Sequence, residues 1–453
     1  MVFEKASLGG AYLRPHRRLF EEYAMRRFFG AVVAMVLASA ARAGDPPRFV
    51  YVDLGKFEPD SSPFTDTAAL AINERGDTTG YSFVFQGTFN NYSLFVPHTF
   101  RKLVAGKLED FGDLRAIDNV FGSHGWAINN LGVIVGDAVF ADIPNPDNSF
   151  NVLAPPVMWI GGRVVSLGLF PGGMGGFGNA INDRNQVVGR IDFPDASVRA
   201  FLWENGDIKN VPGLQDRMSD ASDINNSGHI VGVAACDESN FSHAFLFRDG
   251  ELIDLGSLLP DNMGVSGAVA INGRDQIIGH SLNVPGAGGA FVWDNGVMHE
   301  LLSSTGSVNA NMYDINDFGD IVGQNTSGRA VLWRQGVLYN LNDLIPPQDP
   351  NLYMVLWQAR GINNTGQIVG IAELQDSVSS TSQRAFRLDP VTPDVSGDGV
   401  VDGLDLARLL SAWGSDDPYI DLDGDGVVNT ADLTDLLLHW GPVPERKPYF
   451  WTK

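Results

Sequence analysis

The sequence has little cysteine, little positive charge and no long apolar run. Cys236 is the single cysteine among 453 residues, which excludes a disulfide framework, a cysteine-based zinc site and an iron–sulfur cluster. Lys and Arg number 31 against 54 Asp and Glu, so the formal net charge is −23. A chain of that charge is repelled by a phosphate backbone, and we expect no nucleic-acid partner.

Residues 25–43 read MRRFFGAVVAMVLASAARA, with two arginines, a short apolar run, and small residues at Ala41 and Ala43. This order predicts a signal peptide over residues 1–43, with Met25 as an alternative start. A transmembrane anchor is the alternative, but the run falls short of the roughly 20 residues of a span, and no later segment could cross a membrane. A secreted protein without disulfides is ordinary in bacteria, so we expect a bacterial protein that is extracellular or at the cell surface.

A phrase of the form A-x-x-I-N-x-x-G-x-I-V-G recurs with varying fidelity. Its asparagines are Asn73, Asn129, Asn182, Asn225, Asn272, Asn316 and Asn363, at spacings of 56, 53, 43, 47, 44 and 47 residues. Apolar positions flank a short polar turn, in which Asn can close an Asx-turn and Gly can take a positive φ. Each phrase therefore predicts a β-hairpin, with the asparagines as turn formers.

A second phrase follows the first, as in AFLWENGDIKNVPGL at 200 and AFLFRDGELIDLGSL at 244. It predicts another hairpin, in which an aromatic-rich strand, a tight turn ending in Gly and a Leu-rich strand follow one another. Two hairpins give four short strands in about 47 residues, which is the size of one propeller blade.

The two ends of the repeat region each hold half of a hairpin. RAFRLDP at 384 has no partner strand after it, and FVYVDLGKF at 49 has none before it. A ring in which the N-terminal strand completes the last blade accounts for both halves and leaves no free sheet edge. We therefore predict an all-β, seven-bladed β-propeller over residues 44–389; a β-helix and a tandem β array are the alternatives.

The repeats resemble an extracellular family named for its His-Ala-Phe signature. HAF stands at His243–Phe245, with RAF at 199 and 384, GAF at 289 and HTF at 98 as variants, and the resemblance covers roughly residues 48–389. The resemblance implies an extracellular repeat protein and implies no particular activity. Because other residues replace His243 in the other repeats, we expect it to be structural or solvent-exposed.

Catalytic patterns are scarce. The chain has no His-x-x-x-His pair, no G-x-S-x-G and no P-loop. Gly173, Gly175 and Gly178 match G-x-G-x-x-G, but they precede a strand rather than a helix, so we interpret them as a blade connection. Insertions at 86–97 and 140–155, rich in Asn, Pro and aromatic residues, are candidate loops for a sugar ring or a peptide.

The C-terminal region is the most acidic part of the chain. Residues 394–441 hold eleven Asp, no Glu and one Arg. Two segments 27 residues apart repeat the ligand spacing of an EF-hand-type Ca²⁺ loop. The predicted ligands are Asp394, Ser396, Asp398, Val400, Asp402 and Asp405 in the first loop, and Asp421, Asp423, Asp425, Val427, Asn429 and Asp432 in the second.

Each loop leads into a short apolar-faced helix that ends at Gly, and Val401 and Val428 at loop position 8 are expected to pack the loops together. A duplicated loop–helix with Asp at position 12 resembles a type I dockerin, which implies two Ca²⁺ ions and a cohesin partner. The resemblance assigns partner contact to Gly403, Leu404, Thr430 and Ala431. These positions lack the paired hydroxyls common in such modules, and Leu410 and Leu437 replace basic residues. A partner on the cell surface and pairing within the protein are therefore alternatives to a conventional cohesin.

These patterns predict a signal peptide over 1–43, a propeller over 44–389, a linker over 390–393, a dockerin-like domain over 394–441 and a tail over 442–453. We expect a monomeric, secreted, non-enzymatic binding protein with two bound Ca²⁺ ions and no catalytic residues. Its propeller would display a recognition face for a glycan or peptide. The alternative is an extracellular glycoside hydrolase or polysaccharide lyase carried by a dockerin, which would need a pair of carboxylates, or a base with an Arg or metal, on one rim.

Overall fold

The computed structural model describes residues 46–451 except 58–65, 90–91, 113–119, 145–149, 215–216, 237–240, 260–263, 284–286, 305, 309, 347–352 and 376–380. The predicted signal peptide lies outside the described residues. Among the residues that are described, no helix combines the length and the apolar character needed to cross a membrane.

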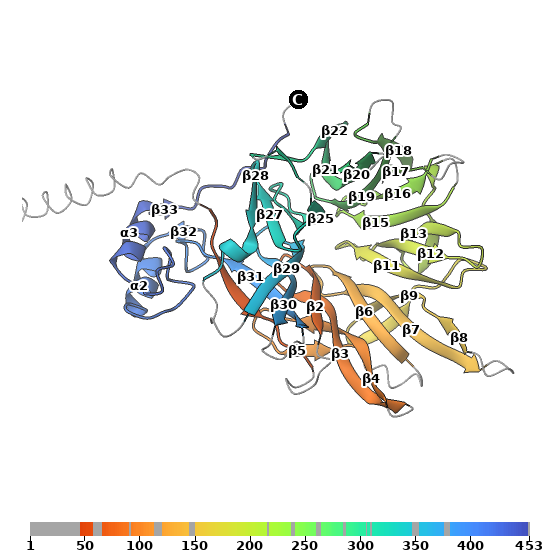
Figure 1. Ribbon diagram of the computed structural model, residues 1–453, viewed down its shortest axis with the longest axis horizontal. Helices are drawn as coiled ribbons and strands as arrows, with labels where there is room; N and C mark the ends of the chain where they lie inside the picture. The colour runs from red at the N-terminus through yellow and green to blue at the C-terminus, as the bar shows by residue number, and fades with distance from the viewer. Residues whose placement is uncertain are drawn as a thin grey trace, which may run out of the picture. The chain divides into compact units, whose positions relative to one another are not determined.

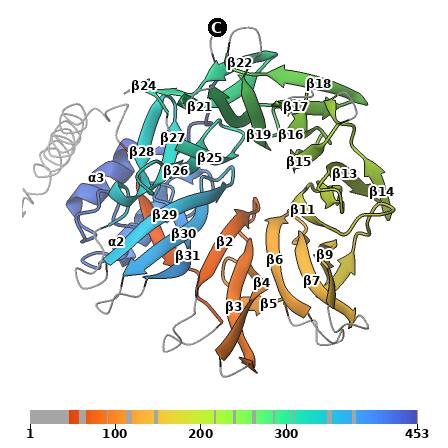
Figure 2. The same cartoon turned by 45° about the vertical axis from the view of Figure 1, so that its right-hand side comes forward.

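Seven antiparallel sheets of four or five strands follow one another along residues 49–390 and surround a common axis (Figure 2). The protein is therefore a seven-bladed β-propeller, which confirms the all-β propeller part of the predicted fold over the β-helix and the tandem array. The α-helices of the described residues are two short ones after residue 400, and Leu341–Asp343 form a 3₁₀ turn, η3.

Each blade is one hairpin of the Ile-Asn phrase followed by one aromatic hairpin (Figure 1). Blade 1 contains β2 (Thr67–Ile72), β3 (Thr78–Phe89), β4 (Tyr92–Lys102) and β5 (Leu108–Asp110). Blade 2 contains β6 (Val120–Ile128), β7 (Ile134–Pro144), β9 (Pro156–Ile160) and β10 (Arg163–Ser166). Blade 3 contains β11 (Gly175–Ile181), β12 (Val187–Asp192), β13 (Val198–Glu204) and β14 (Asp207–Asn210). Blade 4 contains β15 (Ser219–Ile224), β16 (Ile230–Ala235), β17 (Ser242–Arg248) and β18 (Glu251–Gly256). Blade 5 contains β19 (Val265–Ile271), β20 (Ile277–Asn283), β21 (Ala287–Asp294) and β22 (Val297–Glu300). Blade 6 contains β25 (Ala310–Ile315), β26 (Ile321–Asn325), β27 (Ala330–Arg334) and β28 (Val337–Asn340). A small hairpin of β23 (Leu302–Ser303) and β24 (Gly306–Ser307) links blades 5 and 6.

Blade 7 combines the two ends of the repeat region. It contains β29 (Tyr353–Ile362), β30 (Ile368–Gln375) and β31 (Thr381–Pro390), and its outermost strand is β1 (Phe49–Asp53). β1 runs antiparallel to β31, with Tyr51 opposite Leu388 and Asp53 opposite Phe386. The two half-hairpins seen in the sequence are thus strands of one sheet.

The core lies between neighbouring blades. The phenylalanines of the aromatic strands are 0% exposed, namely Phe100, Phe201, Phe245, Phe291 and Phe386. One apolar cluster joins Ala180 and Val188 of blade 3 to Ile230 and Phe245 of blade 4. Each blade therefore covers its neighbour, and burial of these side chains supplies the main driving force for the ring.

The glycine of the I-V-G triplet is required by a bulge in the innermost strand. In every blade the pairing of the first two strands shifts by one residue three positions before the turn asparagine. The bulge pushes a carbonyl oxygen against the second strand. A Cβ at Gly232 would lie 2.0 Å from the carbonyl oxygen of Asp220, and one at Gly279 would lie 2.1 Å from that of Gly267. No side chain fits there.

The insertions predicted as ligand loops extend strands. Residues 86–97 lengthen the β3–β4 hairpin, and residues 140–155 lengthen β7 and contribute β8 (Phe150–Leu153), which pairs with β7. Gly173 lies in a turn, as expected for a blade connection. Gly175 and Gly178 were expected in the same connection, and that is wrong, because both belong to β11, the first strand of blade 3.

Residues Val391–Pro444 form a separate small unit. It contains β32 (Val400–Val401), α2 (Gly403–Ser411), α3 (Thr430–Leu438) and β33 (Gly441–Pro442). Val401, Leu409, Val428 and Leu436 form one buried cluster, as predicted for the two valines. Their backbones do not pair with each other, because Val401 pairs with Gly441 and Val428 bonds residues 414 and 415. Residues 445–451, which lie within the predicted tail of 442–453, belong to the propeller unit.

Candidate functional site

The first acidic loop of the small unit is organised by its two end carboxylates. Asp394 Oδ1 accepts the backbone N–H of Gly397 at 2.8 Å, and its Oδ2 accepts that of Gly399 at 2.9 Å. Asp405 Oδ1 accepts the N–H of Ser396, whose hydroxyl donates to Asp394 Oδ1 at 3.2 Å. Positions 1, 3 and 12 of the predicted ligand set are therefore linked by direct contacts.

The second loop repeats this arrangement. Asp421 accepts the N–H groups of Gly424 and Gly426 at 2.7 and 2.9 Å, and Asp432 accepts those of Leu422 and Asp423. Oxygen atoms of Asp421, Asp423 and Asp432 lie within 4.8 Å of one another. Burial, together with the carboxylates of Asp432, Asp425 and Asp421, raises the pKa of Asp423. A cation between these groups would relieve their repulsion.

Other predicted ligands also serve the loop backbone. Asp398 and Asp425 accept the N–H of the residue two positions later, and Val427 O accepts a hydrogen bond from the Asn429 amide at 2.8 Å. Asp402 and Asn429 cap α2 and α3, each in a capping box with the position-12 aspartate. Position 9 is thus a helix cap, in keeping with its frequent use of a water to reach the ion.

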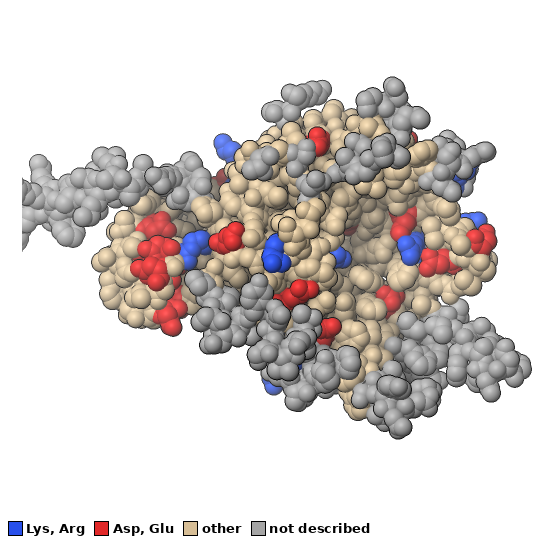
Figure 3. All heavy atoms as spheres, viewed as in Figure 1, with Lys and Arg blue, Asp and Glu red and all other residues tan. Residues whose placement is uncertain are grey.

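The predicted partner positions are accessible. Gly403, Leu404, Thr430 and Ala431 are all exposed in the first turns of α2 and α3. Apolar side chains are exposed at matching positions of both halves, with Leu410 at 53% and Leu437 at 37%, and Trp413 at 44% and Trp440 at 49%. Acidic side chains also gather on the surface of this unit (Figure 3).

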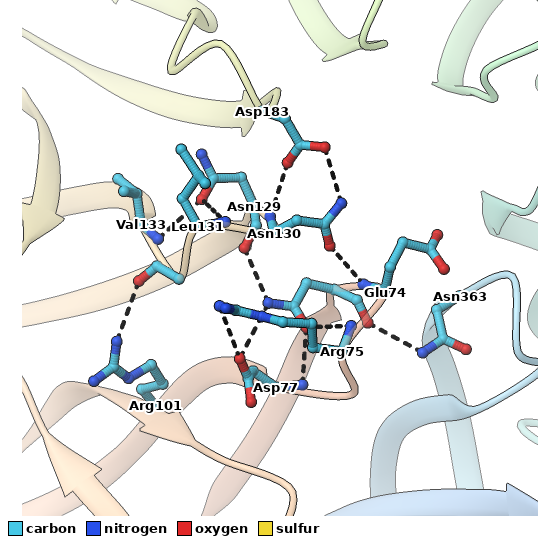
Figure 4. Close-up of polar contacts among 12 residues, drawn as sticks. Glu74, Arg75, Asp77, Arg101, Asn129, Asn130, Leu131, Val133, Asp183 and Asn363 are labelled. Carbon is cyan, nitrogen blue, oxygen red and sulfur yellow. Dashed lines mark hydrogen bonds and ion pairs between the residues drawn. The ribbon is translucent and has the colours of Figure 1, made fainter. Parts of the chain in front are cut away.

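The seven turn asparagines form a closed ring of hydrogen bonds around the propeller axis. Each side-chain amide donates to the backbone carbonyl of the next asparagine, at 2.9–3.1 Å, and Asn363 completes the ring by donating to Asn73 O at 3.0 Å. Each Oδ1 accepts at least one N–H group within its own turn, as at Asn129 with Leu131 and Val133 (Figure 4). The asparagines are therefore turn formers, as predicted, and they also join the blades.

The residues after the asparagines form a second ring at a cavity of about 270 Å³ on the axis. Here a side-chain oxygen accepts the backbone N–H of the preceding blade, as Asn130 does for Glu74 and Asp183 for Asn130 (Figure 4). Gly273 interrupts this ring. Burial, with the nearby charges of Asp317 and Asp183, raises the pKa of Glu74.

In blades 4 and 6 an aspartate, Asp223 or Asp314, stands two residues before the turn asparagine. The other blades have Ala or Gly at this position. Asp223 Oδ1 and Oδ2 accept the N–H groups of Ile224 and Ile271 at 2.8 Å, and Asp314 does the same for Ile315 and Ile362. Each aspartate therefore bridges two blades. Burial raises the pKa of Asp223 to about 6 and that of Asp314 to about 7, where the charge of Asp223 adds to the effect.

The signature histidines are structural. His243 is 5% exposed; its Nδ1 is 3.0 Å from Asp254 and its Nε2 is 3.1 Å from Gly264 O. His98, in blade 1, lies in the same way 3.1 Å from Asp110. The structural role predicted for His243 is confirmed, and the solvent-exposed one is wrong, because the imidazole is buried and both of its nitrogens have partners, Asp254 on the neighbouring strand and the Gly264 carbonyl.

Blade 3 differs at the same two positions and has a groove there. Arg199 replaces the histidine and Asn210 the aspartate, and both line a cavity of about 820 Å³ with Phe170, Arg217 and Met218. The Arg199 guanidinium lies 4.8 Å from the centre of the Phe193 ring. Arg199 makes no salt bridge within the described part of the chain and adds a positive charge to the lining of the groove; Asp195, also in the lining, offsets part of it.

No protein-family model matches the chain, and no curated protein is similar to it. Solved propeller structures are similar at low identity. They include TolB from Acinetobacter baumannii (8% identity, 70% of this chain and 64% of that one, TM-score 0.35) and a puromycin-hydrolysing peptidase from Mycobacterium tuberculosis (12%, 77% and 56%, TM-score 0.42). A gluconolactonase from Xanthomonas campestris matches at 10%, over 77% and 96%, with a TM-score of 0.29. The chain thus spans less than two thirds of the first two proteins, and likenesses this distant carry no functional argument.

Proposed function

We propose that the protein is a secreted binding protein, in which the propeller recognises a ligand and the small unit attaches the protein to a partner when Ca²⁺ is bound. The observation that carries the proposal is the duplicated loop. In both copies the carboxylates at positions 1 and 12 collect the backbone N–H groups of the loop, and in the second copy three carboxylates converge.

Calcium suits these loops because it prefers several oxygen ligands in a flexible arrangement. The side chains that would hold the ions are Asp394, Ser396, Asp398 and Asp405 in one loop and Asp421, Asp423, Asp425 and Asp432 in the other. The Val400 and Val427 carbonyls and Asp402 and Asn429, the latter two through water, would complete the sets. The ions would neutralise two acidic clusters next to the starts of α2 and α3.

A dockerin-like role places the partner on the exposed first turns of α2 and α3, at Gly403, Leu404, Thr430 and Ala431. The exposed Leu410, Trp413, Leu437 and Trp440 favour a partner with an apolar surface. Such a partner is a cohesin-like module or a protein of the cell surface.

The propeller's chemistry favours binding over catalysis. The axial face is lined by asparagines, and the carboxylates of Asp183 and Asp317 are engaged by backbone N–H and amide groups. In the blade 3 groove, Arg199, Asn210 and Phe170 offer a cation, an amide and an aromatic ring, which suits an acidic sugar unit of a glycan. A glycoside hydrolase or lyase remains the second candidate, since buried carboxylates with raised pKa values occur on the axis.

Attachment is tested by measuring retention of the full chain on immobilised cohesin-type modules and on purified bacterial cell envelopes. We expect retention in Ca²⁺, loss in a chelator, and loss in Asp405→Ala/Asp432→Ala. The matched control is Asp416→Ala, because Asp416 is exposed in the same unit and outside both loops. Equal retention with and without Ca²⁺ would contradict the proposal.

Recognition is tested by binding the full chain to acidic and neutral polysaccharides while monitoring the release of reducing or unsaturated ends. We expect binding to an acidic polysaccharide without cleavage, weakened by Arg199→Ala. Cleavage that survives Arg199→Ala and is lost in Asp314→Asn would favour the enzyme.

A further inference from the structure

The last residues of the chain return to the propeller and contact blades 5 and 6. We call Glu445–Trp451 the C-terminal segment. The backbone N–H of Tyr449 donates to Phe318 O at 3.0 Å, and the Gln276 amide donates to Tyr449 O at 3.1 Å. Both backbone groups of Tyr449 are therefore held by Ile-Asn turns of neighbouring blades.

In blades 3 and 7, the glutamine at the position of Gln276 makes a hydrogen bond within its own blade. Gln186 and Gln367 occupy the same turn position in blades 3 and 7. They donate to side chains of their own blades, Glu204 at 2.6 Å and Asp389 at 2.8 Å. In blade 5 the amide is instead satisfied by the C-terminal segment.

Aromatic packing fixes the end of the segment. Trp451 stacks on the fully buried Trp333 of β27, with ring centres 4.6 Å apart and an angle of 20°. Tyr449 meets both rings edge-on, at 5.3 Å from Trp333 and 5.0 Å from Trp451. These distances and angles are favourable for aromatic pairs. The indole N–H of Trp451 is buried and has no partner in the described residues, so stacking rather than hydrogen bonding holds this ring.

Charge fixes the start of the segment. The Arg446 guanidinium pairs with Asp320, whose side chain is 1% exposed, and lies 4.9 Å from the centre of the Phe318 ring. Asp320 also pairs with Arg334 at 2.8 Å. Residues 445–453 contain three basic residues and one acidic one, opposite in sign to the chain as a whole.

We propose that the groove between blades 5 and 6, formed by Gln276, Phe318, Asp320 and Trp333, is a peptide-binding site that takes an arginine followed by two aromatic residues in the spacing R-x-x-Y-x-W. The C-terminal segment of the same chain fills it. The Val391–Pro444 unit is thereby joined to the propeller at both ends of its chain, through Pro390 and through the segment. An attached protein pulled through this unit would share the load between two connections. The load sharing rests on the proposed attachment, whereas the peptide-binding site itself does not depend on calcium.

The test uses a labelled peptide of residues 445–453 and the full chain. In the wild type the groove is occupied, so the peptide should bind weakly or not at all. In the full-chain variant Arg446→Ala/Trp451→Ala the segment is released, and we expect peptide binding at least about tenfold tighter. A peptide with the same two substitutions should not bind, whereas one with Trp451→Phe should, because it keeps the stacking ring.

Failure of the peptide to bind the variant, with propeller circular dichroism unchanged, would overturn the proposal. If release of the segment unfolds the variant, circular dichroism will show a loss of strand signal. Peptide added during refolding should then restore the propeller signal, and no restoration would refute the site. The molar mass in solution tests whether the C-terminal segment occupies the site of its own chain or that of a second copy. A monomer supports binding within one chain, and a dimer that the double substitution dissociates would overturn that part, since the segment would then occupy a second copy.

Discussion

Replacing one ring asparagine should weaken the propeller more than replacing an asparagine that makes the same turn without reaching another blade. Asn272 is 4% exposed. Its Oδ1 accepts the N–H groups of Arg274 and Gln276, and its amide donates to Gln276 Oε1 at 2.9 Å and to Asn316 O at 3.0 Å. Asn325 accepts N–H groups at the same two offsets, and its amide makes no bond to a neighbouring blade in the described residues.

The magnitude follows from the number of bonds lost. At roughly 1 kcal/mol net for each hydrogen bond, Asn272→Ala should cost about 4 kcal/mol and Asn325→Ala about 2 kcal/mol. The difference of about 2 kcal/mol isolates the amide that faces the next blade and Gln276. With a urea dependence of about 3 kcal/mol per molar, Asn272→Ala should lower the unfolding midpoint by about 0.7 M more than Asn325→Ala.

The assay is urea unfolding followed by tryptophan fluorescence, with both variants in one buffer. Equal shifts of the two midpoints would refute the reasoning, because the ring would then contribute nothing beyond its turns. A larger effect of Asn325→Ala would contradict it more strongly, since that side chain is half-buried rather than buried.

Three further outcomes follow from the same structure. Gly279→Ala should prevent folding or cost several kcal/mol, because its Cβ would lie 2.1 Å from Gly267 O, whereas Gly267→Ala, with no atom nearer than 3.6 Å, should be close to neutral in the same urea assay. Burial raises the pKa of Asp314 to about 7, above its unfolded value of about 3.9. Between these two pH values the folded state binds more protons than the unfolded state, so the free energy of unfolding should fall as pH rises from about 4 to about 7. Asp314→Asn should flatten that profile and Asp416→Asn should not; a profile that Asp314→Asn leaves unchanged would show that this carboxyl titrates normally. His243→Ala should cost about 2–4 kcal/mol by removing two bonds and leaving a buried gap, without changing Ca²⁺ binding, and a variant as stable as the wild type would contradict a structural histidine.

The blades could be predicted because each hairpin is specified locally. Alternating apolar residues and the turn I-N-x-x-G specify each Ile-Asn hairpin within about ten residues. The number of repeats then predicts the number of blades in the ring. What each asparagine does beyond its turn could not be predicted, because the acceptor of Asn129 is Asn182 O, on a different blade. That bond exists only once the ring has formed.

The role of the I-V-G glycine was also hidden in the sequence, since the bulge that demands it lies on the opposite strand. Asp223 and Asp314 had a visible signal: both replace Ala or Gly in the repeated phrase, and such a replacement at an axial position marks a side chain on the channel. The groove of blade 3 had no such signal, because Arg also stands at the position of Arg199 in two other repeats, as Arg329 and Arg384. The C-terminal segment was expected to be a tail, because its partners Gln276 and Trp333 are distant in sequence and look like ordinary repeat residues.

The contacts among positions 1, 3 and 12 of the two loops could be predicted from the repeated spacing, and their use as calcium ligands stays a prediction. Sequence could not show that Asp402 and Asn429 are helix caps, since that depends on the backbone of the first helical turn.

Calcium titration of the full chain by calorimetry tests the central claim most directly. The account predicts two Ca²⁺ ions per chain, one ion after Asp405→Ala or Asp432→Ala, and none after both, with Asp416→Ala unchanged. Absence of binding heat in the wild type, or two ions retained in the double variant, would contradict it.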